Sequence, residues 1–263
     1  ILTDYLGNIY YYDDLNETIN SSKKKLILKK VNHNINPKRV FDTFVHDQKF
    51  YIGYTSEIDG CKKINISVAD LSINSLQFKN FFNPEECNKT GGIGRMQFYV
   101  HQNNPGILVS TEEGKHDKPG KNSQNDNSVF GKIIFVNLEN LNYYNFSKGH
   151  RVAQGLYADK NLILATEHGP KGGDEINKII YKKNYGWPIA SYGERYDFKY
   201  GKEPHYKKSH ELYGFEEPIY ASPQGIGISE ILMLSKKFSN FLKKNILVVS
   251  TLADKSIYFV NFN

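Results

Sequence analysis

Hydrophobic and polar positions alternate in short runs along most of the chain, and one unit recurs. The unit is a polar or glycine turn, three or four apolar residues, and then a threonine or serine near an acid or a loop. It occurs at residues 48–55, 105–111, 160–166 and 244–251, and the first residues resemble the end of another copy. The closing threonines are Thr3, Thr55, Thr111, Thr166 and Thr251, with separations of 52, 56, 55 and 85 residues.

Alternating runs flank the copies of this unit, and a period of two predicts half-buried strands. The runs that follow a copy are 8–12, 64–68, 132–136, 176–181 and 256–262, and those that precede one are 39–45, 95–100, 154–157 and 229–234. A three- or four-stranded antiparallel unit that recurs at this spacing is typical of a β-propeller. A large sandwich is the alternative, because its strands are equally short but need no such period. Residues 235–243 are the one short helix expected.

We therefore predict an all-β protein with a single β-propeller domain over residues 1–263 and about five blades visible. Both ends of the sequence fall within a unit, so either a six-bladed propeller lacks about one blade here or five blades close by themselves. The last gap contains a loop-rich insertion at about 184–222. It has too few aliphatic residues for a core of its own, so we expect it to cover one face.

Composition narrows the function only a little. Lysine and arginine exceed the acids by 34 to 28, but the cations are dispersed and no nucleic-acid recognition motif is present. No apolar run approaches the roughly 18 residues of a membrane helix, so no membrane span is expected. The chain starts at Ile1 with no signal peptide, so we expect a processed product or fragment. Cys61 and Cys87 form either one disulfide or two buried free thiols.

Candidate chemistry is concentrated in residues 166–177, TEHGPKGGDEIN, between two apolar runs. The Gly169-Pro170 pair offers adjacent carbonyls, and Asp174 and Glu175 add carboxylates, so a hard cation such as Ca²⁺ suits the segment. The alternative is that the two acids pair with nearby lysines, Lys171 or Lys178.

Zinc is disfavoured in this region of the chain. His150 and His168 are present, but neither has a cysteine or a third histidine at a suitable spacing.

Three motifs in this order and spacing resemble the glucose/sorbosone dehydrogenase family. They are GHRVAQGL at 149–156, TEHGPKGGDEIN at 166–177 and KKNYGWPIASYG at 182–193. The resemblance implies a soluble aldose sugar dehydrogenase with a six-bladed propeller and the cofactors PQQ and Ca²⁺. It also implies a small-molecule sugar substrate, a periplasmic or secreted location, and a homodimer as an assembly to test.

The resemblance also implies roles for individual residues. Arg151 and Gln154 fall on the family's PQQ-binding motif, with Arg151 as counter-charge to the cofactor's carboxylates, whereas Val152 replaces its asparagine. The carbonyls of Gly169 and Pro170 hold the Ca²⁺ that polarises PQQ, with His168 beside them.

A second, structural calcium is implied around the backbone of Tyr185 and Ser191. The metal candidates are therefore Gly169, Pro170, Asp174, Glu175 and Tyr185.

The expected catalytic base is missing from its place in the family pattern. The family carries a histidine just before a Gly-Gly-Arg segment, and residues 88–95 here read NKTGGIGR. Lys89 would need strong desolvation to act as a base near neutral pH, and His101 is too far along the strand. Two functions follow: PQQ- and calcium-dependent oxidation of an aldose to its lactone, or a non-catalytic propeller that binds carbohydrate or protein.

Overall fold

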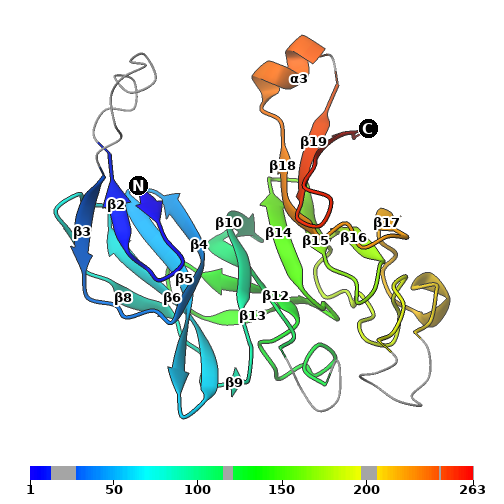
Figure 1. Ribbon diagram of the computed structural model, residues 1–263, viewed down its shortest axis with the longest axis horizontal. Helices are drawn as coiled ribbons and strands as arrows, with labels where there is room; N and C mark the ends of the chain where they lie inside the picture. Colours follow the sequence, from blue (N-terminus) through cyan, green and yellow to red (C-terminus); the bar gives the residue numbers. More distant parts are fainter. Residues whose placement is uncertain (13–27, 115–120, 197–205, 243, 263) are drawn as a thin grey trace. The chain divides into compact units, whose positions relative to one another are not determined.

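The computed structural model describes residues 1–12, 28–114, 121–196, 206–242 and 244–262 (Figure 1). Almost all of its regular structure is antiparallel strand, and the chain divides into two compact units, Ile1–Cys87 and Asn88–Asn263. None of the helices in the described part of the chain has the length and apolar character needed to cross a membrane.

The first unit contains two sheets that pack around one core. One sheet has the order β1 (Leu2–Thr3), β2 (Ile9–Tyr11), β3 (Lys29–His33) and β7 (Ser75–Leu76). The other has the order β4 (Arg39–His46), β5 (Lys49–Ile58), β6 (Cys61–Asp70) and β8 (Lys79–Phe82). The short strand β9 (Cys87–Asn88) straddles the division between the units. The core is made of Ile9, Val31, Phe50, Ile52, Tyr54, Ala69, Leu76 and Phe78.

The second unit contains three sheets in sequence order. The first is β10 (Ile93–His101), β11 (Asn104–Thr111), β12 (Lys132–Asn137) and β13 (Tyr143–Lys148). The second is β14 (Ala153–Ala158), β15 (Ile163–Glu167), β16 (Asp174–Lys178) and β17 (Tyr220–Ser222). The third is β18 (Ile228–Met233), β19 (Ile246–Thr251) and β20 (Ile257–Asn261).

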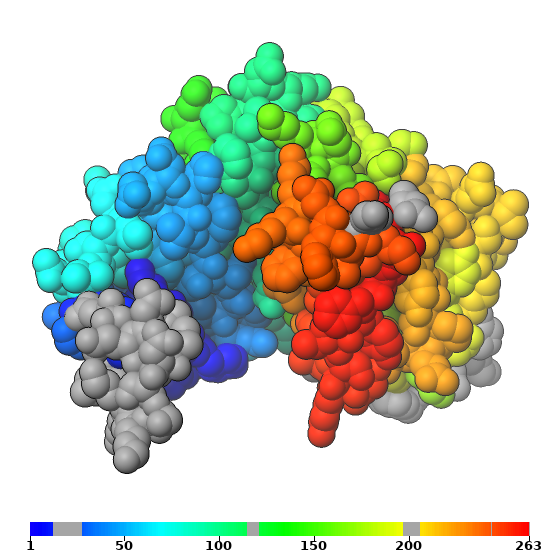
Figure 2. Space-filling view, turned by 90° about the horizontal axis from the view of Figure 1, so that it is seen from above, coloured from blue at the N-terminus to red at the C-terminus, as the bar shows by residue number. Residues whose placement is uncertain are grey.

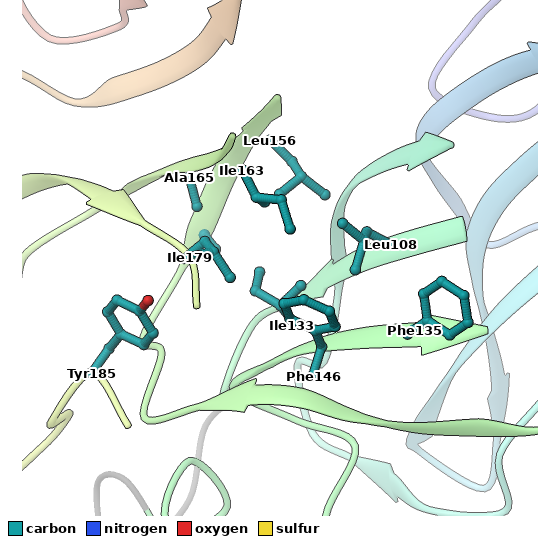
Figure 3. Close-up of a cluster of buried hydrophobic side chains, with 10 residues drawn as sticks. Leu108, Ile133, Phe135, Phe146, Leu156, Ile163, Ala165, Ile179 and Tyr185 are labelled. Atoms are coloured by element: carbon teal, nitrogen blue, oxygen red, sulfur yellow. The ribbon is translucent and has the colours of Figure 1, made fainter. Parts of the chain in front are cut away.

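Apolar side chains of neighbouring sheets meet face to face within the second unit. Leu108, Ile133 and Phe135 from the first sheet contact the layer formed by Leu156 and Ile163 from the second (Figure 3). A further cluster, with Leu164, Ile176, Ile228, Leu247 and Val249, joins the second sheet to the third. The sheets therefore bury their faces against each other, which is how the repeated units share one core.

The described residues confirm the predicted repeat. Five sheets are present, and the closing threonines lie in or at the ends of strands. In three of the five units of the described chain, the hydroxyl of this threonine donates to a backbone carbonyl. The hydroxyl of Thr111 donates to Val129 O at 2.7 Å, that of Thr251 donates to Ser256 O at 3.0 Å, and that of Thr166 donates to Ser229 O.

The boundaries of the chemistry-bearing segment differ from the sequence prediction. The run at 176–181 was expected as a strand, but β16 begins at Asp174 and ends at Lys178, and β15 extends to Glu167. The connection between them is therefore residues 168–173 alone. Polar residues at both ends are drawn into the ladder because β15 and β16 pair from Leu164↔Lys178 to Glu167↔Glu175.

The other local expectations can also be compared with the structure. The predicted helix is confirmed as α3 (Lys236–Leu242), and a 3-10 turn, η1 (Glu211–Tyr213), lies in the insertion. The end of the predicted insertion is not loop, since Tyr220–Ser222 forms β17 beside β16. Residues 197–205 of the insertion lie outside the described residues, and the single-domain assignment for 1–263 stays a prediction.

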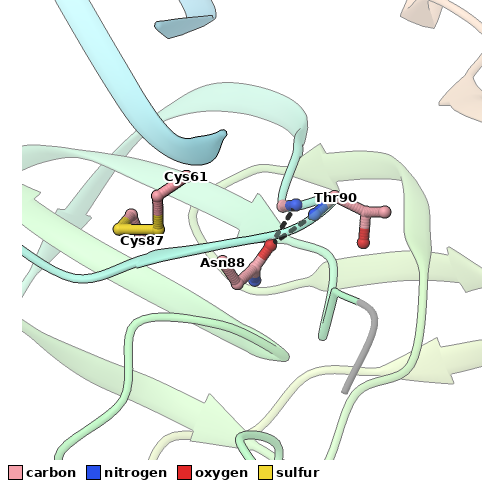
Figure 4. The surroundings of a disulfide bond; sticks show 5 residues. Cys61, Cys87, Asn88 and Thr90 are labelled. Carbon is pink, nitrogen blue, oxygen red and sulfur yellow. Dashed lines mark hydrogen bonds between the residues drawn. A yellow bond between two sulfur atoms is a disulfide. The ribbon is translucent and has the colours of Figure 1, made fainter. Parts of the chain in front are cut away.

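A disulfide joins Cys61 and Cys87, so of the two alternatives for the cysteines the bridge is confirmed (Figure 4). Cys61 is the first residue of β6, and Cys87 lies in the last residues of the first unit, with a Cα–Cα distance of 5.6 Å. The bridge ties the end of this unit back to its second sheet.

Replacing both cysteines by serine is expected to destabilise the protein by about 3 to 4 kcal/mol. The estimate is the chain entropy released when a loop of 26 residues is opened in the unfolded state. Chemical denaturation, with and without reductant, measures the loss. Reductant should shift the wild-type transition and leave the double variant unchanged; equal shifts in both would contradict the prediction.

Candidate functional site

The hairpin of β14 and β15 brings the sequence motifs together. Ala153, the first residue of β14, pairs with Glu167, the last of β15, so Arg151 lies beside the Glu167 carboxylate. The Arg151 amide donates to Glu167 Oε1, and the His168 amide donates to Val152 O at 3.0 Å. The antiparallel register thus fixes both ends of the segment that carries the candidate chemistry.

Two successive hydrogen bonds between buried side chains hold the Glu167 carboxylate. Ser147 Oγ lies 2.8 Å from His150 Nε2, and His150 Nδ1 lies 3.0 Å from Glu167 Oε2. The His150 ring is fully buried and stacks on Tyr185 at 4.7 Å between centroids. The order serine, histidine and carboxylate resembles that of a catalytic triad. Ser147 and His150 are buried and cannot contact a substrate, so these hydrogen bonds serve to orient Glu167.

The Arg151 side chain is held over the site by two contacts. Its Nη1 donates to His168 O at 3.0 Å, and its guanidinium carbon lies 5.2 Å from the centre of the Trp187 ring. The side chain is half-buried. A guanidinium presents five donors in a fixed plane, so these contacts set its orientation as well as its place.

The loop at 168–173 is tied down by Asp174. One carboxylate oxygen accepts from Gly169 N at 3.0 Å, and the other accepts from Gly227 N at 2.7 Å and Ile228 N at 3.1 Å. Gly173 has φ 69°, and a Cβ there would lie 2.0 Å from Gly193 N. The close approach requires glycine and packs the loop against the insertion.

A small pocket lies beneath this loop and joins the second sheet to the insertion. Two carboxylates, two imidazoles, one guanidinium and backbone of the insertion form its walls. The lining residues are Arg151, Glu167, His168, Gly169, Gly173, Glu175, Tyr185, Trp187, Ala190, Ser191 and His210.

The two carboxylates of the pocket face each other across the β15–β16 ladder. Glu167 and Glu175 are register partners, and both are buried. Burial, followed by the charge of Glu167, raises the pKa of the Glu175 carboxyl well above its usual range. Asn177 Nδ2 donates to Glu175 Oε2 at 3.2 Å, and His210 Nε2 lies 3.7 Å from Glu175 Oε1.

Three nitrogens around the pocket are buried without a hydrogen-bond partner among the described residues: His168 Nε2, Trp187 Nε1 and His210 Nδ1. Burial lowers the pKa of both His168 and His210, so both imidazoles are neutral near pH 7. Buried polar atoms are normally paired, and unpaired ones at one place indicate a site for a polar ligand or water.

The predicted site residues are partly brought together. Arg151, His168, Gly169, Glu175 and Tyr185 all line the pocket. For Tyr185 the side chain is already engaged, since its hydroxyl donates to Lys178 O at 2.5 Å and accepts from Ile180 N at 2.9 Å. Its carbonyl is therefore the group that remains for a cation.

Three further candidates point elsewhere. Asp174 binds backbone amides as described, and Gln154 Nε2 donates to Glu112 Oε1 at 3.0 Å. The Pro170 carbonyl accepts from the hydroxyl of Tyr196. Their assigned roles stay predictions, and neither Asp174 nor Glu175 forms a salt bridge with Lys171 or Lys178 among the ion pairs of the described chain.

Two residues of the pocket were missed from sequence. Glu167 belongs to the TEHGPKGG motif and directly follows an apolar run, and this position is the signal that could have identified it. His210 lies in the insertion, where no pattern separates it from its neighbours.

The expected base position holds an exposed lysine. Asn88 Oδ1 accepts from the amides of Thr90, at 2.8 Å, and Gly91, which fixes the turn drawn in Figure 4. Lys89 between them is exposed. The desolvation that a lysine base requires is therefore lacking there.

Residues 39–263 match the Glucose / Sorbosone dehydrogenase family, and the chain belongs to this family. It is 34% identical over 122 residues to the Aldose sugar dehydrogenase YliI of Escherichia coli and 32% identical over 92 residues to Quinoprotein glucose dehydrogenase B of Acinetobacter calcoaceticus. The matches cover 45% and 30% of this chain, but 31% and 19% of those relatives. The chain thus spans less than a third of their lengths.

Solved structures agree on the fold. The soluble aldose sugar dehydrogenase of Escherichia coli in its apo-form superposes with a TM-score of 0.62 at 20% identity, over 82% of this chain and 68% of that one. A PQQ-bound aldose sugar dehydrogenase from Streptomyces coelicolor gives 0.66 at 18% identity, over 99% and 73%. The five sheets are therefore blades of the β-propeller type that this family has, and the sandwich alternative is wrong.

Glu175→Gln is expected to stabilise the cation-free protein at neutral pH by on the order of 1–2 kcal/mol, or about 2–4 °C in Tm. The folded pKa of Glu175 is raised, so its ionisation opposes folding. The wild type keeps its full stability relative to the variant at pH values below the pKa of Glu175 in the unfolded chain. It loses this stability as the pH rises through the pKa of Glu175 in the folded protein.

Melting curves in chelator from about pH 4 to pH 8 measure this difference. Glu139→Gln, the same change at an exposed carboxylate, is the control and should give a flat difference. A difference for Glu175→Gln that does not grow with pH would show that the buried carboxylate carries no such cost.

Proposed function

We propose that this chain forms the cofactor-binding face of a PQQ- and calcium-dependent dehydrogenase that oxidises an aldose sugar to its lactone. The observation that carries the proposal is the pocket under residues 168–173. It combines two opposed buried carboxylates with a half-buried guanidinium and three buried nitrogens that have no hydrogen-bond partner among the described residues, within the part of the chain that matches the family. A periplasmic or secreted location belongs to the proposal and is supported by the Cys61–Cys87 bridge.

The donor set fits a calcium ion. Ca²⁺ binds six to eight oxygens, from carboxylates and carbonyls, with flexible geometry. Glu167 and Glu175 supply buried carboxylate oxygens, and the carbonyls of Gly169, Tyr185 and Ser191 belong to residues that line the same pocket. In the described part of the chain, no group of three or more His, Cys, Asp or Glu side chains is placed so that the side chains alone could hold a metal ion, so such a site would depend on these backbone oxygens.

The rim of the pocket fits an anionic quinone such as PQQ. Arg151 would bind its carboxylates, and His168 Nε2 is a buried atom that needs a polar partner. PQQ, when bound, supplies a two-electron oxidant for the sugar's anomeric carbon. The residues of this chain contribute orientation, because Glu167 and His168 O hold the backbone and side chain of Arg151.

A non-catalytic propeller that binds carbohydrate or protein is the second candidate function. The observation in its favour is the exposed Lys89 where the family pattern has a histidine. A dehydrogenase of this kind needs a base that removes a proton from the sugar. The two candidates share the pocket and differ in turnover.

Purified protein with PQQ and Ca²⁺ is expected to reduce an artificial electron acceptor when aldoses are added, and to melt at a higher temperature with PQQ. Arg151→Gln should weaken PQQ binding by about 10- to 100-fold, because one charge-assisted hydrogen-bonding partner is lost. Arg39→Gln, an exposed arginine of the first unit, is the control. A PQQ-dependent melting shift without dye reduction would favour the non-catalytic candidate, and absence of both would refute the dehydrogenase.

Calcium alone is expected to raise Tm by several degrees, since a ligand at about 100 times its Kd contributes about 2.7 kcal/mol. Glu175→Gln should remove most of this shift, whereas Glu139→Gln should keep it. Differential scanning fluorimetry in chelator and in graded Ca²⁺ measures the effect. If Mg²⁺ at equal concentration gives the same shift, or Glu175→Gln keeps it, the pocket is not the calcium site.

A further inference from the structure

Helix α3 projects from the tip of the β18–β19 hairpin and buries none of its residues. Figure 2 looks onto the side from which it projects, and the orange segment with α3 lies at the surface. The helix is fixed to the hairpin, because Leu234 N donates to Ile246 O at 2.9 Å and Lys244 N to Ser239 O at 3.1 Å. It is thus an ordered protrusion on the strand ladder.

The exposed face of α3 is apolar. Phe238, Phe241 and Leu242 are 57%, 83% and 44% exposed, and their spacing of three and four residues places them on one side of the helix. Ser239 is half-buried and donates to Leu234 O at 3.2 Å, so the helix turns a small polar residue toward the hairpin. Large apolar side chains at such exposure on a projecting tip indicate an interaction site.

Cations surround this apolar face. Lys236 and Lys237 begin the helix, Lys244 follows it, and all three are exposed. No acidic residue occurs between Glu230 and Asp254. Lys236 lies on the side of the helix opposite the three apolar residues, and Lys237, one turn before Phe241, lies at the edge of the apolar face. Exposed phenylalanine and leucine flanked by lysines are typical of helices that lie in the interface of an anionic membrane.

We propose that α3 is a membrane-docking element that inserts Phe238, Phe241 and Leu242 among the lipids of an anionic surface while its lysines contact the headgroups. The inference is independent of cofactor and activity. A protein partner is the weaker alternative, because a stable protein interface needs about 800 Å² on each side, and a single seven-residue helix offers less. A membrane requires only a few inserted side chains and matching charge.

Flotation of the whole chain with vesicles tests the proposal. Vesicles of phosphatidylcholine with roughly 30% phosphatidylserine should carry the protein at low salt, and pure phosphatidylcholine vesicles should carry at least tenfold less. Phe238→Ser with Phe241→Ser should lower binding to the anionic vesicles at least tenfold. Lys236→Gln with Lys237→Gln should lower it by about tenfold or more and reduce its salt dependence.

Two control substitutions remove exposed apolar side chains elsewhere. Leu212→Ser, in η1, changes a residue as exposed as Phe241, at 83%, and Phe259→Ser changes the outer strand β20, at 69%. Both should bind vesicles as the wild type does. The α3 variants should have the same melting temperature as the wild type. The salt dependence of vesicle binding by the wild type tests the proposal even if one variant misfolds.

Three outcomes would overturn the proposal. The proposal is refuted directly if the wild-type protein binds neither kind of vesicle. Binding that survives the α3 substitutions but falls with Phe259→Ser assigns the interaction to β20. Absence of vesicle binding together with concentration-dependent self-association that Phe241→Ser abolishes, measured by sedimentation, assigns α3 to a protein interface.

Discussion

The pairing of β15 with β16 sets the chemistry of the candidate site, because it places Glu167 directly opposite Glu175. Like charges opposite each other destabilise a sheet, and burial of both increases the cost. Hydrogen bonds from Arg151 N, His150 and Asn177 compensate part of it. The cost is lowest when Glu175 is protonated, which is why its pKa is raised well above its usual range.

The pairing of β15 with β16 also restrains the loop that joins them, residues 168–173. Residues 168–173 connect two strands whose ends pair through Glu167 and Glu175, and Asp174 accepts hydrogen bonds from Gly169 N within the connection and from Gly227 N before β18. Gly173 permits the backbone to approach the insertion. The loop is therefore held from three directions, and its carbonyls have a fixed orientation before any ligand arrives. Such pre-organisation lowers the entropy that binding would otherwise cost.

The sequence predicts the repeated strands well because their pattern is local. Period-two alternation and the threonines that close each unit depend on near neighbours, and they located at least two strands in each of the five sheets. They did not locate the other strands, β3, β7, β8, β9, β13 and β17. The sequence prediction placed the ends of β15 and β16 wrongly, because Glu, Asp and Asn are uncommon in strands and indicate a loop. Those side chains are in the ladder because partners far along the chain satisfy them.

The site was predictable only where a motif carried it. Arg151, His168, Gly169 and Glu175 lie in the motifs and share the pocket. His210 is 35 residues beyond Glu175, and nothing near it in the sequence marks it as a partner. The cofactor role of Gln154 stays a prediction, and its motif position says nothing of the Glu112 carboxylate that engages its amide. Contacts between distant segments are decided by tertiary packing, which periodicity does not encode.

The candidate pocket and the position of the expected base lie in different parts of this chain. The pocket is built by the second sheet and the insertion, whereas the expected base position lies before β10, in a turn fixed by Asn88. Lys89 in that turn is exposed, whereas a lysine that serves as a base near pH 7 has to be desolvated. The proposed dehydrogenase and the proposed non-catalytic propeller therefore share one pocket, and they differ in the need for a base outside it.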